Sequence, residues 1–381
     1  MYIHNEIDWP RFKFDREKFA EALAAVHQKQ GRLLERMDAL GFNLQQEANL
    51  RALTEEVIKS SQIEGETLDP ALVRSSIARR LGMDVGGLKP VDGNVEGVVE
   101  MMLDATRNYD QPLTTERLFS WHAALFPTGR SGLDRIQVGA WRDDKKGPMQ
   151  VISGPIGKEY VHFEAPAAQR LETEMNAFLT WFNGETESDW VAKAGLAHLW
   201  FVTLHPFDDG NGRVARAIAD MALARSERSA QRFYSMSAQI GQERAAYYEI
   251  LEKTQKGTMD ITLWMDWFFG CLIRAMDGAE TMLGSVLAKA RFWERLRDFE
   301  VNERQRKVLN RLLDGFEGKL TTSKWAKLAK SSHDTALRDI AALLERGVLV
   351  RNPGGGRSTN YSLLWQASGE TGVGQGKEEK N

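Results

Sequence analysis

The chain has 381 residues, 42% of them hydrophobic, which is enough apolar material for the cores of two or three domains. Its 50 lysines and arginines nearly balance 53 aspartates and glutamates, which excludes a global field that would attract nucleic acid or an anionic membrane. The single cysteine, Cys271, excludes a disulfide framework and predicts a reducing, cytoplasmic compartment. The first residues do not read as a signal peptide, and the most apolar stretch, Leu263–Met276, carries Asp266 and Arg274, so we expect no membrane segment.

Helical spacing of apolar residues dominates the chain and predicts a mainly α fold. The stretches are Phe19–Leu40, Leu50–Ile58, Val95–Leu103, Leu171–Phe182, Ala192–Leu204, Val214–Ala224 and Tyr247–Leu251. Strand-like alternation is scarce. Gln150–Ser153 and Tyr160–Phe163 flank the turn-forming sequence Gly154–Gly157, which predicts one small β-hairpin within a helical domain.

Two interruptions of this pattern suggest domain boundaries. Glycines and Pro90 break it between Gly82 and Asp92, and a long helical segment covers Gly278–Val301. We therefore expect an N-terminal helical domain over 1–90, a core over 91–277, a linking helix over 278–300 and a further domain over 301–366. The tail, 367–381, lacks apolar residues and is expected to be disordered.

The segment Val301–Trp365 has an excess of basic over acidic residues inside a nearly neutral chain. Its order of elements resembles a winged helix-turn-helix. That order is Arg304–Leu313, Thr322–Ala329, Asp334–Arg346, Val348–Arg351, a glycine-rich tip at Gly354–Gly356, and Asn360–Leu363. The presumed recognition helix carries few base-reading side chains besides His333, Thr335 and Arg338, so binding of DNA and binding of protein both remain open.

A polar loop joins the two helices predicted on either side of His205–Gly212. Pro206 and Gly210 exclude one continuous helix, so the loop opens directly onto a helix amino terminus. There, unpaired N–H groups and the helix dipole attract anions. The groups concerned belong to Gly210, Asn211, Gly212 and Arg213. Arg213 and Arg216 are three residues apart and are expected on one helix face, which predicts a polyphosphate site.

Other side chains of this loop are candidates for chemistry. Mg²⁺ binds one or two carboxylates together with phosphate oxygens, so Asp209 is the expected ligand, while Asp208 is less constrained. His205 ends the preceding helix, and an imidazole that titrates near neutrality can accept a proton from an attacking hydroxyl. Phe207 is expected to point inward and to fasten the loop to the core.

Alternative readings of the loop are less consistent with its spacing. If Gly210 or Gly212 were the invariant glycine of a calcium loop, His205 or Phe207 would fall at the first ligand position. The chain contains no GxxxxGK[ST] sequence, which excludes a P-loop. A solvated turn is the remaining alternative, but the joint presence of histidine, acid, Gly-Asn-Gly and two spaced arginines favours function.

These residues resemble the signature of the Fic family, HxFx[DE]GNGRxxR. Its fixed positions are matched by His205, Phe207, Asp209, Gly210, Asn211, Gly212, Arg213 and Arg216. The resemblance implies a protein adenylyltransferase, which moves AMP from ATP to a Ser, Thr or Tyr hydroxyl of a target protein, and of itself, and releases pyrophosphate. It implies that His205 is the base, that Asp209 holds Mg²⁺, and that Asn211, the loop amides and the two arginines bind the phosphates.

Two further segments resemble features of the same family around the nucleotide. MQVISG followed by VHFEAP is similar to the family's flap, a hairpin whose edge aligns the target by strand addition. The residues expected over the nucleotide are Val151, Ile152, Ser153 and Gly154. RAAYYEILEKTQKG is similar to the segment behind the adenine. Its pocket candidates are Tyr247, Tyr248 and Gln255, although adjacent tyrosines on a helix often only pack.

The sequence SSQIEG, with Ser60, Glu64 and Gly65, is similar to the family's inhibitory motif [ST]xxxE[GN]. The resemblance implies that Glu64 pairs with the outer guanidinium, that of Arg216, and occupies the space that the γ-phosphate of ATP needs. The simpler alternative is a solvated helical glutamate. We expect an enzyme that restrains itself.

Several alternatives remain open from the sequence. The chain could be a DNA-binding regulator that uses the Fic core as a nucleotide sensor or dimerisation body, although such a regulator would not need His205. It could also remove AMP as well as add it, with Glu64 positioning a water molecule. Related folds transfer phosphate or phosphocholine, but the complete signature favours AMP. A homodimer is possible, and the target protein cannot be named.

Overall fold

The computed structural model describes residues 2–83, 92–155, 157–184, 189–313, 316, 318–353 and 359–364. It divides the chain into two compact units, Met1–Thr281 and Met282–Asn381. Among the described residues, no helix combines the length and apolar character needed to span a bilayer.

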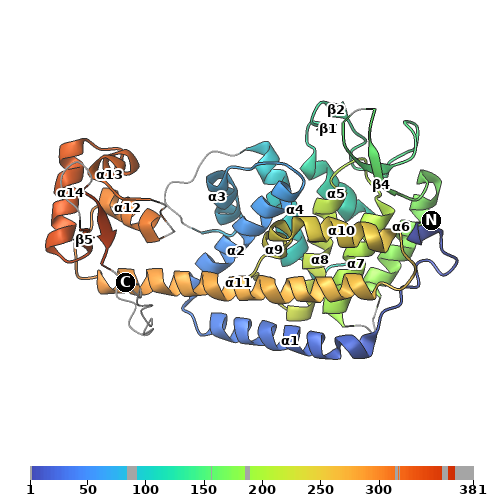
Figure 1. The fold of residues 1–381 in the computed structure, drawn as a ribbon, viewed down its shortest axis with the longest axis horizontal. Coiled ribbons are helices and arrows are strands. Elements are labelled where there is room, and N and C mark those ends of the chain that lie inside the picture. The colour runs from blue at the N-terminus through green and yellow to red at the C-terminus, as the bar shows by residue number, and fades with distance from the viewer. Residues whose placement is uncertain are drawn as a thin grey trace, which may run out of the picture. The chain divides into compact units, whose positions relative to one another are not determined.

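The first unit is helical, with two short pairs of antiparallel strands (Figure 1). After a 3-10 turn, η1 (Ile3–Asn5), its helices are α1 (Arg16–Asp38), α2 (Phe42–Ile63), α3 (Pro70–Arg80), α4 (Gly93–Arg107), α5 (Thr115–Leu125), α6 (Ala168–Asn183), α7 (Trp190–Leu204), α8 (Asn211–Glu227), α9 (Met236–Gln242) and α10 (Arg244–Gln255). The strands are β1 (Arg130–Ser131), β2 (Asp134–Arg135), β3 (Gln150–Ser153) and β4 (Tyr160–Glu164). A long helix, α11 (Thr262–Arg295), begins in this unit and ends in the other.

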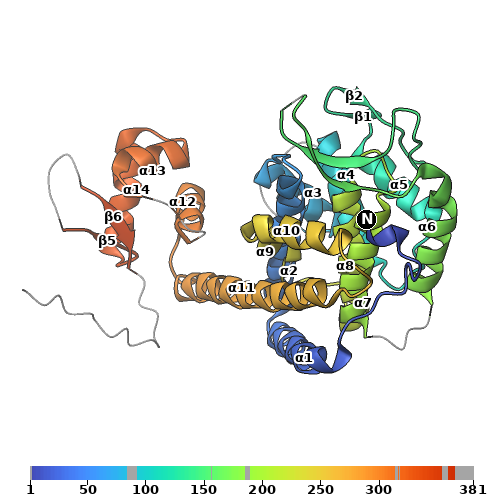
Figure 2. The ribbon, with the colours of Figure 1, turned by 45° about the vertical axis from the view of Figure 1, so that its right-hand side comes forward.

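Helix α7 forms the centre of the first unit. All of its residues from Val191 to Leu204 are buried, as expected for a helix that is apolar on every side. Helix α8 packs along it, and Figure 2 shows the other helices of the unit grouped around this pair. The loop between α7 and α8 is therefore held at both ends by buried helices.

Every helical stretch predicted in the first unit coincides with or overlaps an observed helix, so the mainly α fold is confirmed. Helices α3, α5 and α9 were missed because they are short and their apolar spacing is weak. The prediction of a single hairpin in this unit is wrong, since β1 and β2 also pair. Strands of two residues are too short to show an alternating pattern in the sequence.

The segments expected as separate domains, 1–90 and 91–277, lie in one compact unit. Buried polar contacts join them: the carboxylate of Glu56 on α2 accepts hydrogen bonds from Ser235 Oγ at 2.6 Å and from Ser237 N at 3.0 Å. Apolar contacts join them as well, because the ring of Phe19 on α1 meets that of Phe269 on α11 at 5.4 Å. Helix α2, which precedes Glu64, is thus packed against residues of the segment 91–277.

The second unit continues from α11 with three helices and a strand pair, in the predicted order. They are α12 (Glu303–Leu313), α13 (Thr322–Ala329), α14 (His333–Glu345), β5 (Leu349–Arg351) and β6 (Tyr361–Leu363). A core around the fully buried Trp325 and Ile340 holds them together. The predicted tip, Gly354–Gly356, and the tail, 367–381, lie outside the described residues. The winged helix-turn-helix assignment remains a prediction.

Candidate active site

The loop between α7 and α8 turns through two residues with left-handed backbone. His205, the C-cap of α7, has φ 48° and ψ 56°. Gly210, the N-cap of α8, has φ 80°. A Cβ atom at Gly210 would lie 2.9 Å from the ring of Phe126, so both the backbone conformation and the available space require glycine. The reversal brings the end of α7 beside the start of α8.

A buried aromatic side chain anchors the α7–α8 loop to the core. The side chain of Phe207 is fully buried, which confirms that it points inward, and its ring stacks on that of His122 at 4.1 Å. His122 Nδ1 accepts from Gly139 N at 3.2 Å, and Nε2 donates to the carbonyl oxygen of Asp209 at 3.2 Å. Burial lowers the pKa of His122 to about 4, so this ring is a neutral support. His122 was not identified from the sequence, because no motif surrounds it.

The side chain of Asn211 closes the loop on itself. Its Oδ1 accepts from Phe207 N at 3.0 Å, and its Nδ2 donates to Phe207 O at 2.8 Å. With 2% of its surface exposed, Asn211 is committed to the shape of the loop and does not face outward. The role of this side chain at the phosphates stays a prediction; in this structure both of its polar atoms bond to the backbone of Phe207.

The imidazole of His205 has one nitrogen engaged. Its Nδ1 lies 3.2 Å from the carbonyl oxygen of Val202, and since a carbonyl only accepts, Nδ1 carries the proton. The lone pair of Nε2 is then free to accept a proton. Burial lowers the pKa of His205 despite the opposing effect of that carbonyl, which keeps the ring neutral at neutral pH. These are the properties of a general base.

The carboxylate of Glu64 lies over the start of α8. A Cβ atom at Gly212 would be only 2.1 Å from Glu64 Oε1, so the absence of a side chain at Gly212 is what admits the carboxylate. The first-turn N–H groups of an α-helix have no partner within the helix and attract an anion. Glu64 therefore lies close to a helix terminus that can attract an anion. The N–H of Gly210 is not part of the expected cradle, because it donates to Asp209 Oδ1 at 2.6 Å.

The two arginines of the motif contact the segment that ends α2. Arg216 donates from Nη2 to Glu64 Oε1 at 2.8 Å and from Nε to Ser60 Oγ at 2.9 Å. Arg213 donates from Nη1 to Glu66 Oε2 at 2.7 Å. Each guanidinium is almost fully buried, so each is positioned by these partners. Glu66 was not identified in the sequence, where nothing distinguishes it from a solvated glutamate.

Asp209 offers one carboxylate to a metal ion. Its Oδ1 accepts from Gly210 N, and its Oδ2 accepts from the hydroxyl of Ser131 in β1. Each oxygen keeps further lone pairs, so the group fits Mg²⁺ that is bound mainly through phosphate oxygens. In the described part of the chain, no three His, Cys, Asp or Glu side chains converge to form an all-protein cage. Asp208 Oδ2 accepts a hydrogen bond from Gln137 N at 2.8 Å.

One cavity of about 660 Å³ brings the separate predictions together. It is lined by residues from every predicted group except the metal ligand, namely Glu64, Val151, Ile152, Ser153, His205, Gly212, Tyr247, Tyr248 and Gln255. These residues come from β3, α8 and α10 and from the C-caps of α2 and α7. The other predicted site residues do not line it: Ser60, Gly65, Gly154, Asp209, Gly210, Asn211, Arg213 and Arg216.

The matches to known proteins agree with this geometry. The Fic/DOC family model matches residues 112–223, which include α7, the loop and the start of α8. This segment is a Fic/DOC domain. Residues 2–83 match a domain of unknown function, DUF4172.

Relatives and solved structures extend the similarity beyond the Fic domain. The chain is 25% identical to "Protein adenylyltransferase Fic" of Drosophila melanogaster and of Drosophila sechellia over 263 residues, which cover 68% of this chain and 46% of each relative. The chain thus spans about half the length of these relatives. Among solved structures, a Fic family protein from Desulfovibrio desulfuricans G20 is 20% identical, with a TM-score of 0.51 and coverage of 95% of this chain and 99% of that one. A Fic domain containing signaling protein from Bacteroides thetaiotaomicron VPI-5482 is 19% identical, with a TM-score of 0.51 and coverage of 69% and 97%. These structures show that the fold is shared.

The two tyrosines that line the 660 Å³ cavity differ in exposure. Tyr247 is 2% exposed, and its hydroxyl lies 2.9 Å from His198 Nε2. Tyr248 is 38% exposed, and its hydroxyl donates to Ile63 O at 3.4 Å. Gln255 is buried and donates to Thr203 Oγ1 at 3.3 Å. Tyr248 is therefore the more accessible of the three adenine-pocket candidates, while Tyr247 and Gln255 support the wall.

The predicted flap is the β3–β4 hairpin, and it is held from two sides. Toward α10, His162 Nδ1 lies 2.6 Å from Glu252 Oε2. Toward the N-terminal turn, His4 Nε2 donates to the carbonyl oxygen of Glu164 at 2.8 Å, and its ring packs edge-on against Phe163 at 5.7 Å. A shift in register between Val151 and Ile152 marks a bulge in β3. None of the residues that hold the flap was identified from the sequence, because their partners are distant in the chain.

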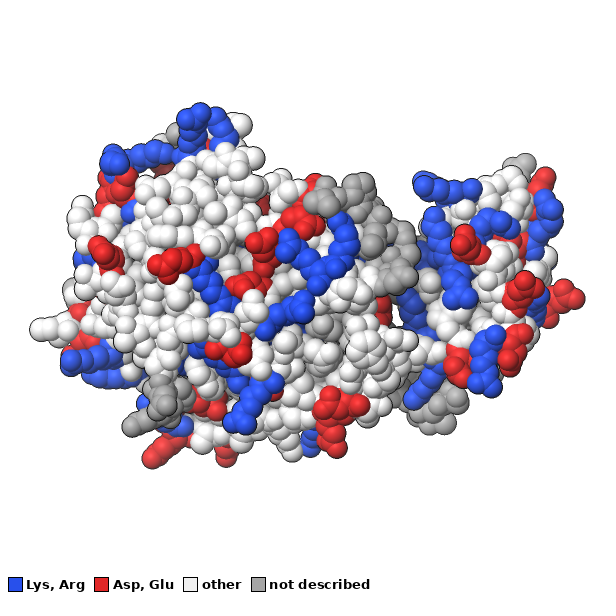
Figure 3. Space-filling model, turned by 180° about the vertical axis from the view of Figure 1, so that it is seen from behind, with Lys and Arg blue, Asp and Glu red and all other residues white. Residues whose placement is uncertain are grey.

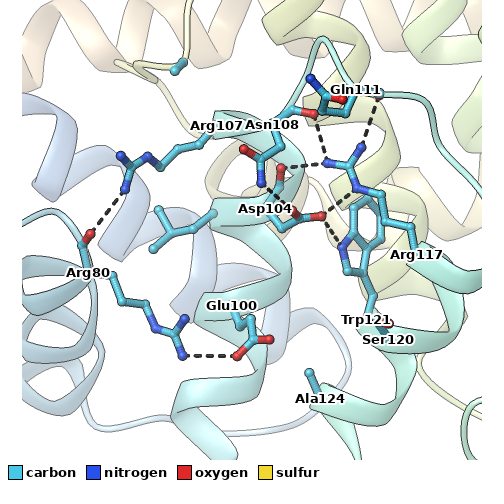
Figure 4. Close-up of a pocket in the computed structure, with 12 residues that line it drawn as sticks. Arg80, Glu100, Asp104, Arg107, Asn108, Gln111, Arg117, Ser120, Trp121 and Ala124 are labelled. Atoms are coloured by element: carbon cyan, nitrogen blue, oxygen red, sulfur yellow. Dashed lines mark hydrogen bonds and ion pairs between the residues drawn. The ribbon is translucent and has the colours of Figure 1, made fainter.

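A larger cavity, of about 970 Å³, lies between α3, α4 and α5 (Figure 4). It contains none of the predicted site residues. Its polar groups are engaged with one another: Arg117 Nε donates to Asp104 Oδ2 at 2.6 Å, and Arg80 pairs with Glu100 at 3.2 Å. Size alone therefore does not identify the site, and the predicted site residues His205 and Gly212 line the smaller cavity.

Proposed function

We propose that this chain is a protein adenylyltransferase that transfers AMP from ATP to a hydroxyl of a target protein and is restrained by Glu64. The observation that carries the proposal is the placement of a neutral His205, with Nε2 free, in the same cavity as the glycine at the start of α8. A base next to an anion-binding helix terminus suits attack of an alcohol on a phosphate. The adenylyltransferases among the relatives add support at low identity.

In the proposed reaction, ATP lies with its phosphates along the first turn of α8. The oxygen of a Ser, Thr or Tyr hydroxyl attacks the α-phosphorus, its proton passes to His205 Nε2, and the bond to pyrophosphate breaks. Arg216 and Arg213 hold the outer phosphates once they are released from the α2 segment. Asp209 would hold Mg²⁺, which supplies positive charge that offsets the charge of the phosphates. Strand β3 would align the target by strand addition.

The proposed restraint follows from competition between two anions. Glu64 Oε1 pairs with Arg216 and lies against Gly212. ATP and this carboxylate would therefore compete for the same cation and the same helix terminus. Gly65, with φ 87°, turns the chain directly after this contact. Any change that removes Glu64 from the start of α8 should increase transfer.

The test is label transfer from α-labelled ATP to proteins of a cell lysate, using the Glu64→Gly chain. Transfer to a lysate protein and to the chain itself is expected, and His205→Ala should reduce the rate about 10²- to 10⁴-fold, as for the loss of a general base. His27→Ala, an exposed histidine on α1, is the matched control. Labelling that persists in His205→Ala would remove the histidine from the mechanism.

A second candidate function concerns the C-terminal unit. We propose that its α13 and α14 bind duplex DNA. Lys324, Lys327 and Lys330 are exposed on or just after α13, and Arg338 is exposed on α14. Figure 3 shows Lys and Arg side chains on this unit, with Asp and Glu side chains among them. Such a surface suits phosphate contacts, which position a protein on DNA.

Binding of a mixed-sequence duplex by the full chain, measured against salt concentration, tests this second candidate. Lys324→Ala with Lys327→Ala should reduce the slope of log K against log salt by about 2, one phosphate contact for each lysine. Lys253→Ala, on the exposed side of α10, should leave the slope unchanged. Absence of binding by the unaltered chain at low salt would reject DNA as a partner.

A further inference from the structure

A hydroxyl, an imidazole and a carboxylate form a chain of hydrogen bonds across the flap. Ser153 Oγ, at the end of β3, lies 2.6 Å from His162 Nε2 on β4. His162 Nδ1 lies 2.6 Å from Glu252 Oε2 on α10. Nothing in the Fic signature includes these three residues, and the loop chemistry described above does not use them.

The direction of these hydrogen bonds follows from the chemistry of the groups. An ionised carboxylate only accepts, so His162 Nδ1 carries a proton and donates it to Glu252. In the neutral ring, Nε2 is then the acceptor, and the hydroxyl of Ser153 must donate to it. A serine that donates to a histidine, which in turn donates to a carboxylate, is the arrangement that activates a hydroxyl for nucleophilic attack.

Glu252 is held in its ionised form by its neighbours. The hydroxyl of Tyr160 donates to its Oε1 at 3.2 Å, and Lys256 Nζ donates to the same oxygen at 2.5 Å. Partial burial raises the pKa of Glu252, but the hydrogen bonds from Lys256 and His162 outweigh it and lower the pKa overall. The carboxylate therefore remains an acceptor for His162 throughout the neutral range.

The three hydrogen-bonded residues lie in the cavity where group transfer is proposed to occur. Ser153, His162 and Glu252 all line the 660 Å³ cavity that also contains His205 and Gly212. Ser153 is exposed, so its hydroxyl is accessible from that space. By contrast, Ser60, whose hydroxyl accepts from Arg216, is completely buried.

We infer that Ser153 is a self-modification site, at which this chain accepts AMP with His162 as the base; this rests on the proposed function. Ser153 Oγ attacks the α-phosphorus of ATP, the new Oγ–P bond forms, and the bond to pyrophosphate breaks. The hydroxyl proton passes to His162 Nε2, and Glu252 stabilises the imidazolium. The product is a phosphodiester between Ser153 and adenosine, attached to the strand that is proposed to receive targets. Modified chains should therefore be poor at modifying other proteins.

The experiment uses the full chain carrying Glu64→Gly, incubated with α-labelled ATP and analysed by peptide mass spectrometry. The peptide containing Ser153 is expected to carry AMP, and Ser153→Ala should abolish that label. His162→Asn should reduce labelling of Ser153 about 10²-fold, the usual effect of removing a general base, and because His162 also holds the flap, labelling of lysate proteins through His205 should fall by a much smaller factor. Tyr160→Phe is the matched control. It removes a hydrogen bond between the flap and α10 but leaves the hydrogen bonds that link Ser153, His162 and Glu252 intact, so Ser153 should still be labelled.

The possible results separate this inference from the proposed function. Label on lysate proteins or on other residues of the chain, with Ser153 unmodified, would overturn the inference and leave the adenylyltransferase proposal standing. Label on Ser153 that is equally strong in His162→Asn would also contradict it. No label on any protein would reject both. Thermal unfolding of each variant, compared with the Glu64→Gly parent, verifies that lost label does not come from lost folding.

Discussion

The two walls of the catalytic cavity are built in different ways. One wall is the continuous segment His205–Arg216, whose shape comes from its own residues, such as Gly210 with its positive φ and Asn211 bridging back to Phe207. The other wall is assembled from α2, the β3–β4 hairpin and α10, which are far apart in the chain.

This difference separates chemistry from its control. The local wall supplies the proposed base and the helix terminus proposed to bind the phosphates, and these groups lie close together in the chain. The assembled wall supplies Glu64, the flap and the tyrosines, and each of these depends on contacts between distant segments. Mutations in the local wall should therefore abolish transfer. Mutations in the assembled wall should change the rate of transfer and the access of ATP and the target to the cavity.

The largest expected effect is in the local wall, at Arg216. In the Glu64→Gly background, Arg216→Ala should reduce transfer from labelled ATP at least 10²-fold, because a buried cation that meets developing phosphate charge is lost. Because the restraint by Glu64 is already absent in this background, the loss of activity reports only on the proposed contact between Arg216 and the phosphates. Arg228→Gly, an exposed position with φ 50° at the other end of α8, is the control. An active double mutant would show that the two walls are not separated in this way.

The next effect is in the assembled wall, at Glu64. Glu64→Gly should raise the initial rate of self-labelling about 5- to 150-fold, the range of a coupling of about 1–3 kcal/mol. Glu64→Gln should raise it less, because the amide can still accept from Arg216. Glu66→Gln should have little effect, since its side chain is 45% exposed, against 29% for Glu64, and exposed ion pairs contribute little. An unchanged rate in Glu64→Gly would dismiss the restraint.

The pH dependence sharpens the assignment of the base in the local wall. Burial lowers the pKa of His205 below its ordinary value of about 6.5, and the reactive form is the neutral ring. The rate should therefore be flat as pH falls from about 8 to 7, and should decline about tenfold per unit only below the lowered pKa. Initial rates of the Glu64→Gly chain between about pH 5 and 8 test this. A decline that begins above about pH 6.5 would contradict a buried, neutral His205.

The smallest expected effect concerns the support of the flap by the N-terminal turn. His4→Ala removes the hydrogen bond to Glu164 O and the ring contact with Phe163. A loss of about 1 kcal/mol should increase amide hydrogen exchange in residues 150–164 about fivefold. Exchange in α7 should not change. If the flap is equally protected in His4→Ala, the N-terminal turn does not contribute to the assembled wall.

The sequence was a reliable guide where structure and chemistry depend on neighbouring residues. Phe207 points inward as expected, and the helices on both sides of the loop have nearly the predicted bounds. It was a poor guide to side-chain partners. The side chain of Asn211 bonds to the backbone of Phe207, and Tyr247, although it lines the cavity, bonds to His198. Neither partner could be read from the residue type, because packing decides which of several possible hydrogen bonds forms.

The sequence by itself determined the loop, because a histidine, two special glycines and a helix start within a few residues leave the backbone little choice. It also determined the helical fold, through apolar periodicity that any α-helix must satisfy to bury one face. Only the tertiary structure decided that Glu64 lies on Gly212, that Glu66 pairs with Arg213, and that Ser153, His162 and Glu252 align. Hydrogen bonds between distant segments depend on how helices pack, and neither propensity nor spacing along the chain carries that information.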